Sequence, residues 1–306
     1  MSELKVKFLG VEFSNPLVLP SGIMQAISAH KRAEEMGFGG VTVKSLTVEA
    51  RKGNPLPRVI KYEYGYLNSV GLINPGIKEG VKQLTELVKD SKIPVLASVF
   101  AINVKDFKLL AKEVVKAKPD LVELNLSCPN TTDELGEPLG MGMESTAAAV
   151  KGVRQIVDKS VRLIAKLSPN VANIGEVARV AEEAGADAIC AINTVGPGMV
   201  IDLETKKPKL GNKEGGVSGS GIRPIAVRCV WDIYKSVKVP IIGMGGVESA
   251  RDVVEMMMAG ASLVGVGTAT YVHGPKVIEK IKKDLLEYMK KNKIKSLKEL
   301  VGVAHK

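Results

Sequence analysis

The chain has 306 residues, of which 45% are hydrophobic and 25% charged, a composition typical of a globular protein with a large core. The sequence contains no long uncharged apolar run and no charged leader followed by an apolar stretch, so we expect neither a transmembrane helix nor a signal peptide. The chain has three Cys and three His, which do not show the spacing of metal ligands. We therefore expect no disulfide framework, no metal site and a reducing, cytoplasmic environment.

The net charge of +10 is compatible with nucleic-acid binding, with attraction of an anionic substrate or cofactor, or with a solvated Lys-rich surface. The lysines are spread along the chain, and only 4% of the residues are aromatic, so stacking platforms for bases are scarce. We therefore expect no nucleic-acid partner.

Short β-rich runs recur along the chain. The first residues alternate Leu4, Val6 and Phe8 with lysines, which predicts an N-terminal β-hairpin. Eight further runs follow at residues 17–22, 41–45, 94–99, 121–127, 162–168, 188–194, 240–246 and 263–268.

Helical patterns separate most of these runs. Apolar residues repeat at helical spacing within 107–114 and 174–181, and further helices are expected at 145–160, at 249–259 and after Pro275. Repeated strand–helix alternation predicts an α/β fold, a (β/α)8 TIM barrel formed by residues 1–306 as a single domain. An open doubly wound sheet remains an alternative, because periodicity counts strands without showing closure.

Three connections are longer than ordinary strand–helix loops: residues 46–75, 128–144 and 195–222. Each follows a strand, so each is expected as an insertion on the face of the barrel where the strands end. We interpret them as lids and substrate loops.

Residues 121–130, LVELNLSCPN, place Cys128 and two Asn side chains at the end of the fourth barrel strand. Pro129 cannot continue the strand. A carboxamide has both a donor and an acceptor, which suits an imide or amide edge, and a thiol can serve as a base once its pKa is tuned. The stretch therefore predicts chemistry on a polar heterocycle.

Other polar side chains are predicted at strand ends. They are Lys44, Asn125, Lys166, Asn193 and Thr194. An isolated Asn at a strand end caps a loop about as often as it binds a ligand, but two inward lysines are costly to bury without an anionic partner. The set therefore favours an anionic ligand.

Glycines follow the last two barrel strands at Gly245, Gly246 and Gly267, next to Thr268, and Gly219 and Gly221 precede a helix. Loops at this place in a barrel commonly hold a phosphate, although each glycine pattern alone also fits simple turn chemistry. A phosphate with two lysines and several carboxamides fits FMN, with Lys166 as the cation beside the flavin.

The motifs NSVGLINPG (68–76), LNLSCPN (124–130), AKLSPN (165–170), AINT (191–194) and GGVSG (215–219) together resemble the class 1 dihydroorotate dehydrogenases. The resemblance covers essentially the whole chain. It implies a barrel that binds one FMN and oxidises (S)-dihydroorotate to orotate in the synthesis of pyrimidines and UMP.

The resemblance also implies residue roles. Cys128 would be the base that takes the C5 proton while the C6 hydride passes to flavin N5. Orotate would be held by Lys44, Asn68, Ser69, Val70, Gly71, Leu72, Asn125, Asn130, Asn193 and Thr194. FMN would be lined by Ser21, Lys44, Ser45, Asn125, Lys166, Ile192, Gly219, Gly245, Gly246, Gly267 and Thr268.

Within class 1, GGVSG followed by IRPIAV is more similar to the B type. That similarity implies a second subunit that carries FAD and a 2Fe-2S cluster and passes electrons to NAD, in a heterotetramer of two plus two subunits around a homodimer core. The alternative within the class is the A type, a homodimer that reduces fumarate. Ser98 and the SGSGI segment (218–222) depart from the usual residues.

Three further hypotheses remain open. The first is a dihydropyrimidine dehydrogenase-like flavoenzyme, which shares the SCPN and AKLSPN motifs. The second is a barrel lyase that uses Lys44 or Lys166 as a Schiff base. The third is a basic binding protein without catalysis. We interpret Cys190 and Cys229 as inert core thiols, and His30 and His273 as loop or surface residues without a catalytic role.

Overall fold

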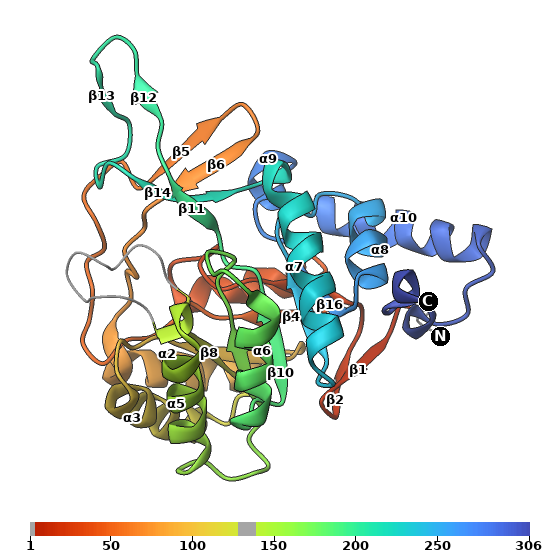
Figure 1. Cartoon of the computed structure of the whole chain (residues 1–306), viewed down its shortest axis with the longest axis horizontal. Helices are drawn as coiled ribbons and strands as arrows, with labels where there is room; N and C mark the ends of the chain where they lie inside the picture. Colours follow the sequence, from red (N-terminus) through yellow and green to blue (C-terminus); the bar gives the residue numbers. More distant parts are fainter. Residues whose placement is uncertain (1–3, 128–138) are drawn as a thin grey trace.

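The computed structural model describes residues 4–127 and 139–306. Its centre is a closed barrel of eight parallel strands in which the last strand pairs with the first (Figure 1). The strands are β3 (Leu17–Leu19), β4 (Gly40–Thr42), β7 (Val95–Val99), β8 (Leu121–Asn125), β9 (Leu163–Lys166), β10 (Ala188–Ala191), β15 (Ile241–Met244) and β16 (Ala261–Gly265). Each strand overlaps one predicted run. The TIM barrel is therefore confirmed, and closure excludes the open sheet.

Helices surround this barrel. They are α1 (Arg32–Glu35), α2 (Gly76–Asp90), α3 (Val104–Val114), α5 (Met143–Arg154), α6 (Ile174–Glu183), α7 (Arg223–Ser236), α8 (Ala250–Met258), α9 (Ala269–Val272) and α10 (Val277–Lys291). The short 3-10 helices are η1 (Ile27–Lys31), η2 (Val115–Ala117), η3 (Leu139–Met141), η4 (Ser220–Ile222), η5 (Leu297–Glu299) and η6 (Val303–His305). No helix in the described part of the chain is long and apolar enough to cross a membrane.

Side-chain caps fix several helix starts. Asn103, Asn173 and Ser249 each accept a hydrogen bond from the backbone N–H three residues on, and Ser249 forms a capping box with Asp252. The expected start at Ser145 is wrong. The Ser145 hydroxyl instead donates to the Leu139 carbonyl at 2.5 Å, and α5 begins at Met143 and ends at Arg154, six residues before the expected end.

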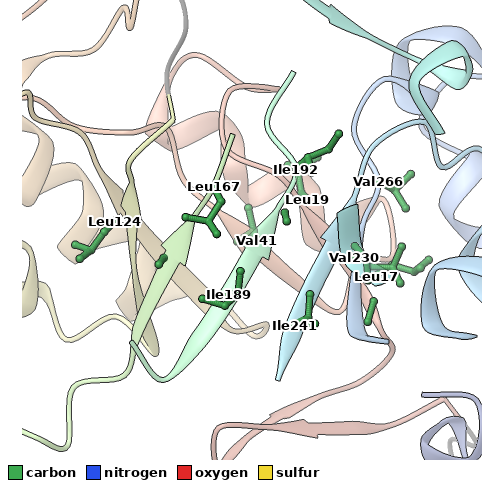
Figure 2. Packing of buried hydrophobic residues seen from close by; sticks show 14 of the residues in the cluster. Leu17, Leu19, Val41, Leu124, Leu167, Ile189, Ile192, Val230, Ile241 and Val266 are labelled. Atoms are coloured by element: carbon green, nitrogen blue, oxygen red, sulfur yellow. The ribbon is translucent and has the colours of Figure 1, made fainter. Parts of the chain in front are cut away.

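Alternate strand residues face two different apolar environments. Leu17, Ile189 and Ile241 point outward and belong to the cluster that packs against the helices (Figure 2). Helix α7, which carries Val230, packs against the strands of Ile189 and Ile241. Val18, Leu96 and others face inward, in a smaller cluster inside the barrel. Because a strand buried on both faces has no polar side, these strands appear in the sequence as continuous apolar runs.

The N-terminal hairpin closes one end of the barrel. Strands β1 (Val6–Phe8) and β2 (Val11–Phe13) pair antiparallel, as predicted. Phe8 and Phe13 meet edge to face with ring centroids 6.3 Å apart, and both belong to the inner cluster. This end is therefore filled, which leaves the opposite end for a site.

The long insertions build a second sheet at that opposite end (Figure 1). Strands β5 (Val59–Tyr62), β6 (Gly65–Asn68), β11 (Val195–Gly198) and β14 (Gly215–Ser218) are ordered β11-β14-β6-β5. Between β11 and β14, the hairpin of β12 (Ile201–Asp202) and β13 (Lys207–Pro208) projects outward (Figure 1). Two insertions far apart in sequence thus combine into one wall above the barrel.

Candidate active site

A cavity of about 340 Å³ lies between the C-terminal ends of the barrel strands and the sheet above them. Most of the residues predicted for the site line it: Ser21, Lys44, Ser45, Asn68, Val70, Gly71, Leu72, Asn125, Lys166, Ile192, Asn193, Thr194, Gly219, Gly245, Gly246, Gly267 and Thr268. The fold therefore brings residues from seven of the eight barrel strand ends and from both insertions to one place.

Two buried lysines give the cavity its positive charge. Lys44 follows β4 and is 5% exposed, while Lys166 ends β9 and is 4% exposed. On the neighbouring strands, Lys166 is in register with Asn125 and with Cys190. Two cationic side chains on one wall make the cavity electropositive, which favours an anionic ligand.

The hydroxyl of Ser45 is the centre of a hydrogen-bond network on the cavity wall. Its Oγ lies 3.2 Å from Ser21 Oγ and 2.9 Å from Ser98 Oγ, and it accepts from Asn125 Nδ2 at 3.0 Å. Behind the wall, Ser98 donates to Glu123 Oε1 at 2.8 Å. Four strand ends are therefore joined by polar side chains.

A second network fixes the two carboxamides. Asn125 Oδ1 accepts from Ser127 Oγ at 3.2 Å, and Ser127 Oγ accepts from Asn193 Nδ2 at 2.9 Å. Asn193 Oδ1 in turn accepts from the backbone N–H of Thr194 at 2.8 Å. The orientation of both amide groups is thereby set before any ligand binds, which reduces the entropy lost on binding.

The glycine-rich end of the cavity has no space for side chains. Gly246 has φ +72°, and a Cβ there would lie 2.7 Å from Cβ of Arg223 and 2.8 Å from the Gly219 carbonyl oxygen. Gly219, with φ +106°, would place a Cβ 2.7 Å from Gly65 Cα. Packing against these neighbouring protein atoms therefore requires glycine at both positions. Both glycines also line the cavity, where backbone without side chains suits a phosphate.

Several wall residues were missed by the sequence reasoning. Among them are Tyr66, Ser218, Glu248 and Tyr271. Tyr66 and Tyr271 lie with ring centroids 6.2 Å apart, and the hydroxyl of Tyr271 donates to the Ile23 carbonyl at 2.5 Å. Burial, with a smaller contribution from Tyr66, raises the pKa of Tyr271 above 10.0. Neither tyrosine belongs to a recognisable motif, so only the fold reveals their position.

Three predicted residues are not seen on the wall. Ser69 is fully buried, does not line the cavity, and accepts a hydrogen bond from Asn54 Nδ2 at 2.8 Å. Strand-like alternation around Asn68 explains this, because adjacent side chains point in opposite directions. Cys128 and Asn130 lie outside the described residues.

The structure also corrects one of the histidines. His30, expected in a loop or at the surface, is 1% exposed and lies in η1. His273 is partly exposed and contacts Glu248 Oε2 at 3.1 Å, as a surface residue would.

Cys190 and Cys229 are buried, and burial raises the pKa of Cys229 to about 11, so both are core thiols as predicted. Within the described ranges, no group of three His, Cys, Asp or Glu side chains could hold a metal.

Comparisons with known proteins identify the family of this chain. A family model described as dihydroorotate dehydrogenase matches residues 3–289. A "Dihydroorotate dehydrogenase B (NAD(+)), catalytic subunit" of Pyrococcus horikoshii is 41% identical and covers 99% of this chain and 98% of the relative. The Methanothermobacter thermautotrophicus protein of the same name is 40% identical over 99% of this chain and 98% of its own length.

A solved structure shows the same fold. The Eimeria tenella DHODH in complex with ferulenol matches with a TM-score of 0.87 at 24% identity, over 100% of this chain and 89% of that one. The whole-length family match and the curated relatives decide the membership. The chain belongs to the dihydroorotate dehydrogenase family and is an oxidoreductase that oxidises dihydroorotate to orotate in pyrimidine biosynthesis.

Proposed function

We propose that this chain is the catalytic subunit of a B-type, NAD-linked enzyme that holds one FMN in the cavity. The observation that carries the proposal is the convergence of two buried lysines, two oriented carboxamides and a glycine-walled end in one cavity. When bound, FMN supplies a hydride acceptor for the oxidation of dihydroorotate.

The wall fits the two ends of FMN. The glycines at 219, 245, 246 and 267, with the Thr268 hydroxyl, line one end of the cavity and suit the phosphate, because no side chain covers their backbone. Ser21, Ser45, Asn125, Lys166 and Ile192 suit the polar heterocycle. In this arrangement Lys166 places a positive charge beside a ring system that gains negative charge on reduction.

The other wall residues suit the substrate. Orotate and dihydroorotate have an imide edge, which pairs with carboxamides such as Asn68 and Asn193, and a carboxylate, which Lys44 and backbone N–H groups attract. Thr194, Asn125 and the 70–72 segment complete this side, whereas Ser69 is not part of it. We include Asn130 in the substrate site on the resemblance of its motif alone.

We also propose Cys128 as the base that removes the C5 proton. It directly follows Ser127, whose hydroxyl joins Asn125 to Asn193 on the cavity wall. Cys128→Ser should retain FMN and lose most of its rate of flavin reduction by dihydroorotate at neutral pH, because a hydroxyl is a far weaker base precursor than a thiol. Full-rate reduction in this variant would remove Cys128 from the role.

The partner is proposed from the names of the relatives. "Catalytic subunit" in those names supports a second subunit, for which we propose FAD, a 2Fe-2S cluster and electron transfer to NAD in a cytoplasmic heterotetramer of two plus two subunits. The chain itself would form the homodimer core. The alternative is a fumarate-reducing homodimer, and the acceptor decides between them.

The test is anaerobic reduction of the purified yellow protein. Dihydroorotate should bleach the flavin absorbance, whereas dihydrouracil should not, which separates this enzyme from a dihydropyrimidine dehydrogenase. Fumarate and NAD are then offered separately. Recovery of colour with neither supports a missing electron-transfer subunit, and recovery with fumarate alone contradicts the B-type assignment. A colourless protein that does not take up added FMN would contradict the flavin proposal.

A further inference from the structure

A carboxylate lies buried in the interior of the barrel. Glu123 is in the middle of β8 and is 1% exposed. It points inward, because its strand neighbours Val122 and Leu124 belong to the outer cluster that packs against the helices. Glu123 does not line the cavity, so it contacts neither ligand directly. A buried charge at such a place is costly unless hydrogen bonds satisfy it.

Glu123 is connected to the cavity wall through two serines. Ser98 Oγ lies 2.8 Å from Glu123 Oε1 and 2.9 Å from Ser45 Oγ. Ser98, like Glu123, lies behind the wall, whereas Ser45 is part of it. All three side chains are at most 2% exposed, so water does not compete for these bonds.

The donor in each bond of this chain follows from the carboxylate. A carboxylate can only accept hydrogen bonds, and a hydroxyl has one proton to donate. Ser98 therefore donates its hydrogen bond to Glu123 and accepts one from Ser45. Ser45 has then no proton left. It accepts from Asn125 Nδ2 at 3.0 Å and from the hydroxyl of Ser21 at 3.2 Å.

The consequence reaches the cavity surface. Ser21 gives its proton to Ser45, so it faces the ligand as a hydrogen-bond acceptor only. Asn125 has its Nδ2 toward Ser45 and its Oδ1 toward Ser127, so its remaining amide proton is the donor that it can offer. One buried carboxylate thus decides which wall groups donate and which accept.

Glu123 has a thiol among its neighbours in the barrel interior. Cys190 on β10 also faces the barrel interior, and its pKa is raised chiefly by burial and further by Glu123, against a smaller opposite effect of Lys166. The thiol therefore stays neutral beside the carboxylate. Lys166 and Glu123 are on adjacent strands, so a positive wall group has a negative group behind it.

We propose that Glu123 is a positioning residue of the flavin site: through Ser98 and Ser45 it sets the hydrogen-bond direction of Ser21 and Asn125, and its charge offsets that of Lys166 beside the flavin. The proposal rests on FMN occupying the cavity, as argued above. It assigns to Ser98 the role of linking the carboxylate to the wall.

The experiment compares FMN binding to the apoproteins of the wild type, Glu123→Gln, Ser98→Ala and the double variant. The amide of Gln can donate or accept, and Ser98→Ala cuts the chain, so each single change should weaken FMN binding about three- to tenfold, the effect of one hydrogen bond. The double variant should be no weaker than the weaker single variant, because both changes remove the same chain.

The flavin midpoint potential separates the effect of the Glu123 charge from the effect of the hydrogen-bond chain. Glu123→Gln removes a buried negative charge and should raise the potential, whereas Ser98→Ala keeps the charge and should shift it less. Ser168→Ala is the matched control. Ser168 is 1% exposed, and its hydroxyl accepts from the backbone N–H of Asn170, outside the chain. This control should match the wild type in both measurements.

Each outcome is decisive. Wild-type affinity and potential in Glu123→Gln, or effects of the two single variants that multiply in the double variant, would overturn the positioning role. A thermal melting curve shows whether Glu123→Gln folds. If it does not, Ser98→Ala still tests the proposal, because this substitution changes little volume. Wild-type FMN affinity in Ser98→Ala would then be enough to overturn the proposal. Failure of the wild type to bind FMN would instead overturn the proposed function.

Discussion

At the scale of single residues, the ring of His30 is an unusual buried polar group. Its Nδ1 lies 2.9 Å from the Ala26 carbonyl and 3.1 Å from the Ile27 carbonyl, so Nδ1 carries the proton. Among the described residues, its Nε2 is a buried side-chain atom without a hydrogen-bond partner. Burial, with a smaller effect of Lys44, lowers the pKa of His30 below 6.5.

This residue should make stability depend on pH. Below pH 6.5 His30 is protonated in the unfolded chain, whereas in the folded chain it stays neutral until the pH falls to its lowered pKa. Between these two pKa values the unfolded chain binds more protons, so the free energy of unfolding falls as the pH falls. Chemical denaturation at pH 7.5 and 5.5 should therefore show a smaller loss for His30→Gln than for the wild type. Equal losses in the two proteins would contradict this assignment.

Residue types and spacing in the sequence predicted most of the residues that line the cavity, but not which of two adjacent residues faces it. Lys44, Lys166 and Asn125 could be recognised because polar residues at the ends of apolar strands are conspicuous. Ser69 does not line the cavity, which the sequence could not show because it does not reveal the pleat of this segment. Tyr66 and Tyr271 were missed because their approach depends on the packing of two distant elements. The position of His30 depended likewise on tertiary burial.

At the scale of elements, Arg154 fastens the end of α5 to the barrel. Its Nη2 lies 2.5 Å from Asp187 Oδ2, and its Nε and Nη1 donate to the carbonyls of Gly185 and Val161, each at 3.0 Å. Asp187 also accepts from the backbone N–H of Leu163 at the start of β9. One half-buried guanidinium thus joins a helix to the beginnings of two strands.

Arg154→Met should lower the free energy of unfolding by about 2 kcal/mol, because it removes several charge-assisted hydrogen bonds and leaves Asp187 without its close partner. The matched control is Arg179→Met on α6. Arg179 pairs with Glu176 and Glu183 at 2.7 and 2.6 Å but is 42% exposed, so the expected loss is at most about 1 kcal/mol. Urea denaturation of both variants measures the difference, and equal losses would contradict the anchoring role.

Elements with strong local signals were predicted well, and those that depend on distant partners were not. The cap at Ser249 is local, so α8 begins where the sequence indicates. Strand β6 pairs with β14, with Asn68 opposite Gly216, across a separation that no local pattern encodes. The sequence therefore predicted insertions on the active face without the sheet that they form.

At the scale of the whole molecule, the cavity depends on the complete barrel. Its wall extends from Pro20, after the first barrel strand, to Tyr271, after the last. A ligand in this cavity contacts only the folded chain. Binding therefore stabilises the entire barrel, by about 2.7 kcal/mol at a free ligand concentration one hundred times Kd.

Added FMN should accordingly raise the Tm of the apoprotein, with a shift that grows with the logarithm of the FMN concentration. Riboflavin, which lacks the phosphate, is the control and should give a clearly smaller shift at equal concentration, because the glycine-walled end would then have no anion to bind. Differential scanning fluorimetry measures both. Equal shifts would contradict the assignment of that end to the phosphate.

Closure of the barrel also has a consequence for the growing polypeptide on the ribosome. Strand β3 is complete by Leu19, but β16, which pairs with it, ends only at Gly265. At translation rates of roughly 5–20 residues per second, β3 waits roughly 12–50 s for this neighbour. During that time the edge of this first barrel strand is open to other partners, which makes it a liability for aggregation until synthesis is almost complete.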